Sequence, residues 1–506
     1  MTSLMTWLRT ISASVWTALA AGGVALVLAH QTLHGGSVSY DEGVYWQSLR
    51  AMADGHLLFS SVFSSQAPLF LLSVYPFYLL FGQSIIAARL ALVVFSVAGV
   101  IGTYIAGRAL GHRAIGIVAC LLLALDPLYE RAAHALQAEL PSIVLQIWAV
   151  ACAALSMHAN ERRRGWLALS AGILLGCASL IKLYAIAALV PVVMLLCAPF
   201  FQWLHDNRSH RQTTRDLIQE ALRKTMPSLG LLAAGLLGAT IVTLLPFIDR
   251  LDDVYDQVVR FHLVAGQFDR HPMHAELWQI AEQLGSAPLV YVAALAVLVI
   301  AWRPMWVSVP LILWALAAFV VLLHVQPLWN HHIVLLSPAL ALISGCGAAV
   351  ALQEFQSPGA NRLGLAAMLA LLVAASGAGL LVNLRQNETA RRPPSASELD
   401  MVKALQAATA PGDVVLSDNQ YVAALANRDV PPQMVDTSYV RIKTGYLTTA
   451  QLKDLITHNR IPAILFATGR FDRLIGFRAW VAQRYSLAAT FGKDKSLFLL
   501  GTGIAR

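Results

Sequence analysis

Residues 11–45 read ISASVWTALAAGGVALVLAHQTLHGGSVSYDEGVY and join a long apolar run to an adjacent pair of carboxylates, Asp41 and Glu42. The apolar run is long enough to be a first membrane span. Carboxylates are costly to desolvate near a bilayer, so a pair just outside the first span indicates a functional role. The alternative is a solvated loop whose acids cap the next helix, since Asp and Glu are favoured at helix N-termini.

The whole chain has the composition of an integral membrane protein. Of its 506 residues, 57% are hydrophobic and 13% are charged, which leaves too little polar surface to cover a soluble globule. Apolar windows of roughly 17–25 residues recur about eleven times between Ile11 and Asn383. We therefore predict a polytopic α-helical membrane domain over residues 1–390.

The character of the chain changes after residue 390. Residues 391–506, the C-terminal domain, have soluble composition and alternate between helix-like and strand-like segments, which predicts a small α/β domain. Asp413, Asp418 and Asp436 lie at the ends of strand-like segments, where they could bind a ligand or serve turns and caps. The expected helices are Glu398–Ala410, Thr448–Asn459 and Phe477–Tyr485, and the expected strands are Asp413–Ser417, Ala463–Phe466 and Ser496–Leu500.

Basic residues predict the orientation of the chain in the membrane. They fall on alternate loops, which the positive-inside rule assigns to the cytoplasm. The N-terminus is then cytoplasmic, and the C-terminal domain is extracytoplasmic on a multi-pass cell-membrane protein. The chain has a net charge of +8, and its basic residues lie in these short loops instead of forming one stripe that could bind nucleic acid. The basic loop residues are Arg9, Arg108, Arg113, Arg162, Arg163, Arg164, Arg208, Arg211, Arg215, Arg223, Lys224, Arg303 and Arg362.

The first outer loop, residues 34–82, contains a second apolar segment. Ala67–Gly82 is interrupted by Pro68 and Pro76 and is shorter than the roughly 20 residues that cross a bilayer. We expect an interfacial or re-entrant helix there. The loop therefore forms a substructure at the membrane surface, with Asp41 near one end.

Several stretches resemble the C-type-fold glycosyltransferases, in particular the protein-mannosyltransferase-like and aminoarabinose-transferase-like enzymes, which include bacterial lipopolysaccharide core transferases. The resemblance covers most of the membrane domain, and its most specific part is the first outer loop. It rests on Tyr40-Asp41-Glu42-Gly43-Val44-Tyr45, Gln66-Ala67-Pro68-Leu69, Leu80-Phe81-Gly82-Gln83-Ser84, Ala88-Arg89-Leu90, Ala138-Glu139-Leu140-Pro141, Lys182-Leu183, His331-His332 and Pro338-Ala339-Leu340.

The resemblance implies transfer of a sugar from a polyprenyl-monophosphate donor to an external glycan, lipid or protein acceptor, with inversion at the anomeric carbon. In this family the first-loop Asp is the general base, a position that Asp41 occupies. Glu42 beside it could raise the pKa of Asp41 toward a useful range. Tyr45, Gln66 and Glu139 are expected to bind substrate, although some relatives carry Lys near the position of Gln66.

A leaving phosphate needs cations at the outer ends of the spans. We expect this role for Lys182, Arg89, Arg131, His331 and His332. Arg89 and Arg131 could instead be snorkelling or paired side chains, Glu139 could be a helix N-terminal acid, and the two histidines could be interfacial. Lys182 lies in a long apolar region, where a charge indicates function.

Metal dependence and the reaction class are left open by the sequence. The outer loop near residue 270 holds histidines and acids without the spacing of a compact metal motif. A polytopic transporter or lipid flippase is the main alternative to a transferase, but we find no convincing internal repeat. The loop residues in question are His262, Asp269, His271, His274 and Glu276.

Overall fold

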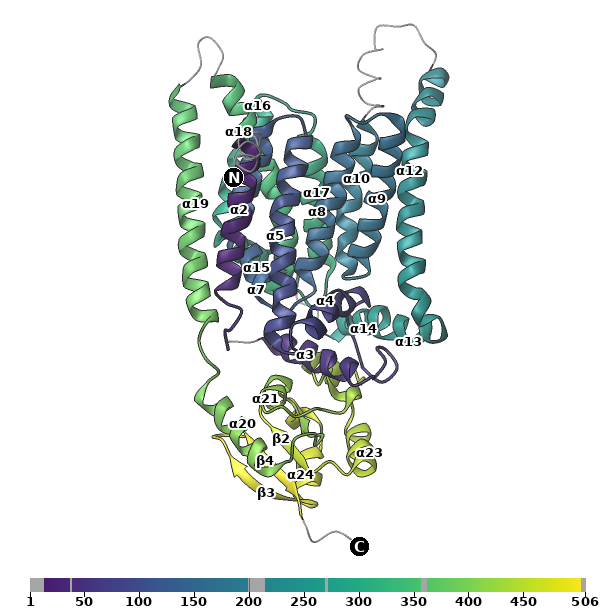
Figure 1. Ribbon diagram of the computed structural model, residues 1–506, viewed down its shortest axis with the longest axis vertical. Coiled ribbons are helices and arrows are strands. Elements are labelled where there is room, and N and C mark those ends of the chain that lie inside the picture. The colour runs from purple at the N-terminus through teal and green to yellow at the C-terminus, as the bar shows by residue number, and fades with distance from the viewer. Residues whose placement is uncertain are drawn as a thin grey trace, which may run out of the picture.

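The computed structural model describes residues 13–36, 39–198, 200, 214–268, 272–355 and 362–501. Five residues discussed above lie outside these ranges: Arg9, Arg208, Arg211, Asp269 and His271. The described chain forms a helical bundle joined to a small domain that contains a sheet (Figure 1).

Apolar helices form the bundle, and most of those labelled in Figure 1 run along its long axis. Small residues let neighbouring helices approach closely. A Cβ on Gly172 would lie 2.1 Å from the carbonyl oxygen of Leu232, so the contact between α9 and α12 requires glycine. The bundle helices are α2 (Ala13–His30), α5 (Ile85–Ala109), α6 (Arg113–Ala124), α8 (Glu139–Ser156), α9 (Glu161–Ser179), α10 (Leu189–Leu196), α12 (Thr214–Leu244), α16 (Pro288–Trp302), α17 (Ser308–His324), α18 (Ser337–Phe355) and α19 (Arg362–Ala390).

Five helical stretches among the described residues are long and apolar enough to cross a membrane, and a bent pair gives a sixth. Shorter apolar helices accompany them, so the total of about eleven spans stays a prediction. The five stretches are Ile85–Ala109, Glu139–Ser156, Thr225–Phe268, Asn330–Phe355 and Ala366–Ala390, the bent pair is Met273–Gly285 with Pro288–Trp302, and the shorter helices are Val15–His30, Leu69–Leu80, Arg113–Ala124, Leu183–Leu196 and Ser308–His324.

Short helices lie between the bundle and the C-terminal domain, and several of them are visible there in Figure 1. The apolar segment Ala67–Gly82 forms α4, which starts after Pro68 and contains Pro76. The short elements of the membrane part are α3 (Tyr40–Ala53), α4 (Leu69–Leu80), α7 (Pro127–His134), η1 (Leu183–Ala188), η2 (Leu245–Arg250), α13 (Leu251–Tyr255), η3 (Asp256–Arg260), α14 (Phe261–Phe268), α15 (Met273–Gly285) and η4 (Asn330–Leu336).

The C-terminal domain contains a four-stranded sheet of order β1-β2-β4-β3, in which β1 and β2 are parallel and the other pairs antiparallel. The predicted helices and strands are confirmed within a few residues, although only the last two residues of Asp413–Ser417 are strand. The elements are α20 (Ala396–Ala408), β1 (Leu416–Ser417), α21 (Gln420–Leu425), η5 (Pro432–Met434), α22 (Tyr439–Lys443), α23 (Thr449–Asn459), β2 (Ala463–Phe466), η6 (Phe471–Arg473), α24 (Phe477–Ala482), β3 (Tyr485–Thr490) and β4 (Ser496–Leu500).

Helix α3 is the surface on which the C-terminal domain docks. A Cβ on Gly43 would lie 2.6 Å from the backbone nitrogen of Tyr421, so α21 packs directly on the α3 backbone. Gln47 donates to the carbonyl of Arg428 at 3.0 Å. These contacts fix the C-terminal domain against the helix that carries Asp41.

Candidate active site

One cavity of about 360 Å³ lies where the bundle, helix α3 and the C-terminal domain meet. It gathers polar side chains from segments that are far apart in the sequence, as expected of a binding site. The polar and aromatic residues of its wall are Tyr40, Asp41, Tyr45, Gln66, Gln137, Glu139, Lys182, Tyr184, His262, Gln326, Trp329, His331, His332, Asp436, Ser438, Tyr439 and Arg470.

Asp41 is the second residue of α3 and faces this cavity. Ser39 caps the helix by accepting from the backbone nitrogen of Glu42 at 3.4 Å, which fixes where α3 begins. Gln137 Nε2 lies 3.5 Å from Asp41 Oδ2. Burial raises the pKa of Asp41, the Glu139 carboxylate adds to the rise, and the charge on His331 opposes it. A carboxyl with a raised pKa is suited to accept a proton from a hydroxyl.

Glu139 and Lys182 form an ion pair in the cavity wall. Glu139 is the first residue of α8, and Lys182 directly precedes η1. The Lys182 ammonium also lies 5.1 Å from the centre of the Tyr184 ring. Both charged side chains are largely buried, so each stabilises the other where water is scarce.

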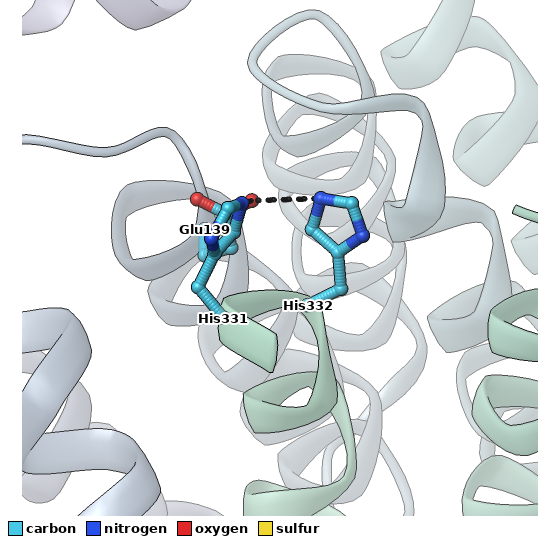
Figure 2. Close-up of side chains that lie close together, drawn as sticks. All are labelled: Glu139, His331 and His332. Atoms are coloured by element: carbon cyan, nitrogen blue, oxygen red, sulfur yellow. Dashed lines mark ion pairs between the residues drawn. The ribbon is translucent and has the colours of Figure 1, made fainter. Parts of the chain in front are cut away.

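His331 and His332 lie beside the same carboxylate (Figure 2). Their Nε2 atoms are 3.6 Å and 3.7 Å from Glu139 Oε1. The ring of His332 packs edge-on against Tyr184, with ring centres 5.1 Å apart. Glu139, Lys182, His331 and His332 therefore form one charged cluster, which we call the Glu139 cluster.

The Glu139 cluster has three side chains of metal-binding type within 4.8 Å of one another, Glu139, His331 and His332. The arrangement does not fit a metal ion, because the Lys182 ammonium occupies the carboxylate. The backbone nitrogen of Trp329 also donates to His332 Nδ1 at 3.3 Å, which puts the proton of a neutral ring on Nε2, the atom that faces Glu139. In this arrangement Lys182 already neutralises the Glu139 carboxylate, and His332 turns an N–H rather than a lone pair toward it.

Tyr45 and Gln66 lie in the wall near Asp41. Burial raises the pKa of Tyr45 well above its ordinary value, and a hydrogen bond with Gln66 partly opposes the rise. The Tyr45 ring also packs edge-on against Phe70 at 4.7 Å between centres. Both side chains are thus held where a bound sugar could contact them.

Glu42 and Arg89 do not belong to the described wall of this cavity and bind each other. Arg89 Nε and Nη2 lie 2.9 Å and 3.1 Å from the two carboxylate oxygens of Glu42. Arg89 also donates to the carbonyl of Gly35 at 2.7 Å, and Glu42 accepts from the backbone nitrogen of Leu136 at 2.9 Å. In this structure the pair therefore joins α3, α5 and the segment before α8.

The remaining predicted residues are more peripheral. Arg131 borders a small neighbouring cavity shared with Gln137 and His331, and it donates to Gln283 at 3.1 Å. Of the outer-loop histidines and acids, His262 lines the main cavity and Glu276 contacts Gln326.

Sequence reasoning missed most of the wall that the C-terminal domain supplies. Asp436 was predicted only as an acid at the end of a strand-like segment, and no sequence pattern pointed to Ser438, Tyr439 or Arg470. They reach the cavity because the C-terminal domain docks on α3, where the backbone nitrogen of Thr437 donates to the Tyr40 hydroxyl at 2.8 Å. No local sequence pattern could have identified these residues as part of the cavity wall.

Part of the chain matches a known protein family. Residues 65–213 match the dolichyl-phosphate-mannose-protein mannosyltransferase family. No curated protein sequence matches the chain.

Solved structures share the fold over nearly the whole chain. ArnT from Cupriavidus metallidurans bound to undecaprenyl phosphate is 17% identical with a TM-score of 0.69, covering 98% of this chain and 100% of that one. The Archaeoglobus fulgidus oligosaccharyltransferase in the apo form is 12% identical with a TM-score of 0.56, covering 98% of this chain and 75% of that one. The arabinofuranosyltransferase AftD from Mycobacteria is 14% identical with a TM-score of 0.54, covering 97% of this chain and 40% of that one.

The predicted polytopic helical fold with a small C-terminal α/β domain is therefore confirmed. The chain is thus a multi-pass membrane protein whose residues 65–213 resemble the protein mannosyltransferases and which shares its fold with the ArnT and oligosaccharyltransferase structures.

Proposed function

We propose that this protein transfers a sugar from a polyprenyl-monophosphate donor to an acceptor hydroxyl at the extracytoplasmic face of the membrane, with Asp41 as general base. The observation that carries the proposal is the convergence of Asp41 and the Glu139 cluster on one cavity. A base and a buried cation beside one space are what glycosyl transfer from a phosphate leaving group requires.

In the proposed reaction, Asp41 takes the proton of the acceptor hydroxyl. The oxygen attacks the anomeric carbon, and the bond from that carbon to the phosphate oxygen breaks with its electron pair. Polyprenyl phosphate leaves, and attack from the opposite side inverts the anomeric centre. Lys182 would stabilise the negative charge that grows on the phosphate, with His331 and His332 as neighbouring hydrogen-bond donors.

Glu139 fits a supporting role in this scheme. Its ion pair with Lys182 holds the ammonium at the cavity wall, and its negative charge helps to raise the pKa of Asp41. Tyr45 and Gln66 would contact the sugar, while Glu42 and Arg89 would hold α3 in place instead of contacting substrate. Arg131 borders the neighbouring cavity and would add positive charge near the phosphate.

The inference that the sugar donor is lipid-linked rests on the proposed orientation of the protein in the membrane. The basic residues Arg108, Arg113 and Arg162–Arg164 lie at the ends of α5, α6 and α9, in loops that we assign to the cytoplasm. The cavity would then open outside, away from cytoplasmic nucleotide sugars, and a polyprenyl carrier can present a sugar there. Reporter fusions at Arg163 and Asp436 test this orientation, and a cytoplasmic signal at Asp436 would contradict it.

The donor class is tested with the purified protein and a membrane extract as the pool of acceptors. We expect it to consume an undecaprenyl-phosphate-linked sugar, to release undecaprenyl phosphate and to add the mass of one sugar to a component of the extract. A nucleotide sugar should give no product. Vectorial movement of the lipid-linked sugar without a new glycosidic bond would instead indicate a transporter or flippase.

A further inference from the structure

Arg470 brings a cation from the C-terminal domain to the wall of the cavity. It lies in the short connection between β2 and η6, which Asp418 holds in place. The fully buried Asp418 carboxylate accepts from the backbone nitrogens of Ala467 at 2.6 Å and Thr468 at 3.1 Å. Its second oxygen accepts from the backbone nitrogens of Arg470 at 3.0 Å and Phe471 at 3.3 Å. These hydrogen bonds therefore fix the backbone of the connection at Arg470.

The side chain of Arg470 is also fixed in direction. Its guanidinium carbon lies 3.6 Å from the centre of the Tyr40 ring, which is a cation–π contact. The Tyr40 hydroxyl is itself bound by Thr437. The Nε atom of Arg470 is buried and has no hydrogen-bond partner among the described residues. A buried donor without a partner costs free energy, so this half-buried guanidinium has hydrogen-bonding capacity left for a ligand.

The two cations of the cavity wall differ in their pairing. Lys182 is matched by Glu139, whereas within the described ranges no carboxylate forms an ion pair with Arg470. They also come from different parts of the fold. Lys182 directly precedes η1 of the bundle, whereas Arg470 belongs to the C-terminal domain and lies against the ring of Tyr40, the residue before Asp41.

We propose that Arg470 binds an anionic group, a phosphate or a carboxylate, on the acceptor, and that the C-terminal domain thereby forms the acceptor subsite. This inference rests on the proposed glycosyl transfer. The donor phosphate belongs with Lys182 and the bundle, because its polyprenyl chain must run between the spans. Inversion requires the acceptor to attack from the side of the sugar opposite to that phosphate. Asp41 takes the proton on the acceptor side, so the acceptor would lie next to Asp41 and toward the C-terminal domain. An arginine there favours an acceptor with two anionic oxygens close to its reacting hydroxyl.

Binding of a charged and a neutral sugar tests the proposal without turnover. The protein, in lipid nanodiscs and saturated with undecaprenyl phosphate, is titrated with glucose 6-phosphate and with glucose. The parent should bind the phosphorylated sugar on the order of tenfold more tightly, which is the scale of a hydrogen bond to a charged group. Arg470→Gln should abolish this preference, and Arg470→Lys should retain part of it.

Arg484→Gln is the matched control, because Arg484 is an exposed arginine of the same domain that stacks on Trp480 at 4.6 Å. It should leave the preference unchanged. The proposal is overturned if the parent shows no preference or if Arg470→Gln keeps it. Weaker binding of undecaprenyl phosphate by Arg470→Gln would also overturn it, since Arg470 would then serve the donor. If the preference is lost in Arg470→Gln but the parent forms no glycosidic bond, anion binding stands and the proposed transferase function fails.

Discussion

Glu42 and Arg89 form a buried two-point ion pair, with Arg89 Nε 2.9 Å and Nη2 3.1 Å from the two oxygens of the Glu42 carboxylate. Asp41, the preceding residue, faces the cavity. Adjacent positions on a helix point about 100° apart, so two neighbouring acids reach different environments. The ion pair holds α3 against α5, and α3 in turn holds Asp41 at the cavity.

Replacing Glu42 should therefore affect stability more than chemistry. Glu42→Gln leaves the Arg89 charge buried without its partner, which costs about 3–5 kcal/mol. We expect a lower unfolding temperature of the purified protein, measured by light scattering or intrinsic fluorescence during heating. Combining Glu42→Gln with Arg89→Met should recover much of the loss, because the uncompensated charge is removed.

Asp429→Asn serves as the comparison, since it removes a partly exposed ion pair with Arg50 (2.6 Å) at the far end of α3. Such pairs contribute roughly 0–1 kcal/mol, so its unfolding temperature should stay close to that of the parent. A Glu42→Gln protein as stable as the parent but without turnover would assign Glu42 to the chemistry instead.

Lys182→Met should weaken binding of undecaprenyl phosphate. The change removes a cation at the cavity wall and keeps the apolar stem. Loss of a hydrogen bond to a charged group corresponds to roughly a 10–100-fold higher Kd, measured by titration in nanodiscs.

The single substitution also exposes the negative charge of Glu139, which would repel phosphate by itself. The double variant Lys182→Met with Glu139→Gln separates the two effects. If Lys182 contacts the phosphate, the double variant still binds weakly. Full recovery of affinity in the double variant would mean that Lys182 acts only by neutralising Glu139.

The rate of transfer should fall in acid as Asp41 becomes protonated, because only the ionised carboxylate can act as a base. An ordinary Asp has a pKa of about 3.9. Burial raises the pKa of Asp41, so the fall in rate should occur at a higher pH than it would for an ordinary Asp. The negative charge of Asp436 adds to the rise. Asp436→Asn should therefore move the acid limb of kcat/KM to lower pH.

Asp413→Asn is the control for that pH profile. Asp413 belongs to the same domain and accepts from the backbone nitrogen of Ala410, but it does not belong to the described wall of the cavity. Its acid limb should coincide with that of the parent. An unchanged limb in Asp436→Asn would show that another group controls the acid side.

Removal of divalent metal should not change the rate of transfer. The Lys182 ammonium occupies the Glu139 carboxylate, and His332 turns a protonated nitrogen toward it. Turnover after treatment with EDTA, followed by the release of undecaprenyl phosphate, should equal that of untreated protein. Loss of activity that Mn²⁺ or Mg²⁺ restores would contradict this arrangement of the cluster.

Local sequence patterns predicted most elements of the C-terminal domain. Ala463–Phe466 and Ser496–Leu500 match β2 and β4 residue for residue, because short apolar runs between turn residues are typical of buried strands. β3 was missed, since most of its residues between Tyr485 and Thr490 are exposed and their side chains carry no strand pattern. Pairing with β4, a tertiary effect, decides its conformation.

The site was predictable where a charge stands in an apolar segment or a motif matches a family. Asp41, Glu139 and Lys182 were found that way, and all three line the cavity. The sequence could not predict that Arg89 would be paired with Glu42, because the two are separated by a whole loop. Arg470 could not be predicted either, because its position at the cavity depends on the docking of the C-terminal domain on α3, a contact between segments far apart in the sequence.

The central claim is that Asp41 is the base of a glycosyl transfer in this cavity. It is tested most directly by comparing Asp41→Asn with Asp54→Asn, which changes an exposed carboxyl at the other end of the same helix. Both proteins are supplied with an undecaprenyl-phosphate-linked sugar and the membrane extract, and the glycosylated product is quantified by mass spectrometry. Undecaprenyl phosphate affinity is measured on the same preparations.

The account predicts that Asp41→Asn forms product about 10²–10⁴-fold more slowly than the parent, because the amide cannot accept a proton. It should still bind undecaprenyl phosphate, and Asp54→Asn should behave as the parent. Product formation by Asp41→Asn within a few fold of the parent rate would contradict the account.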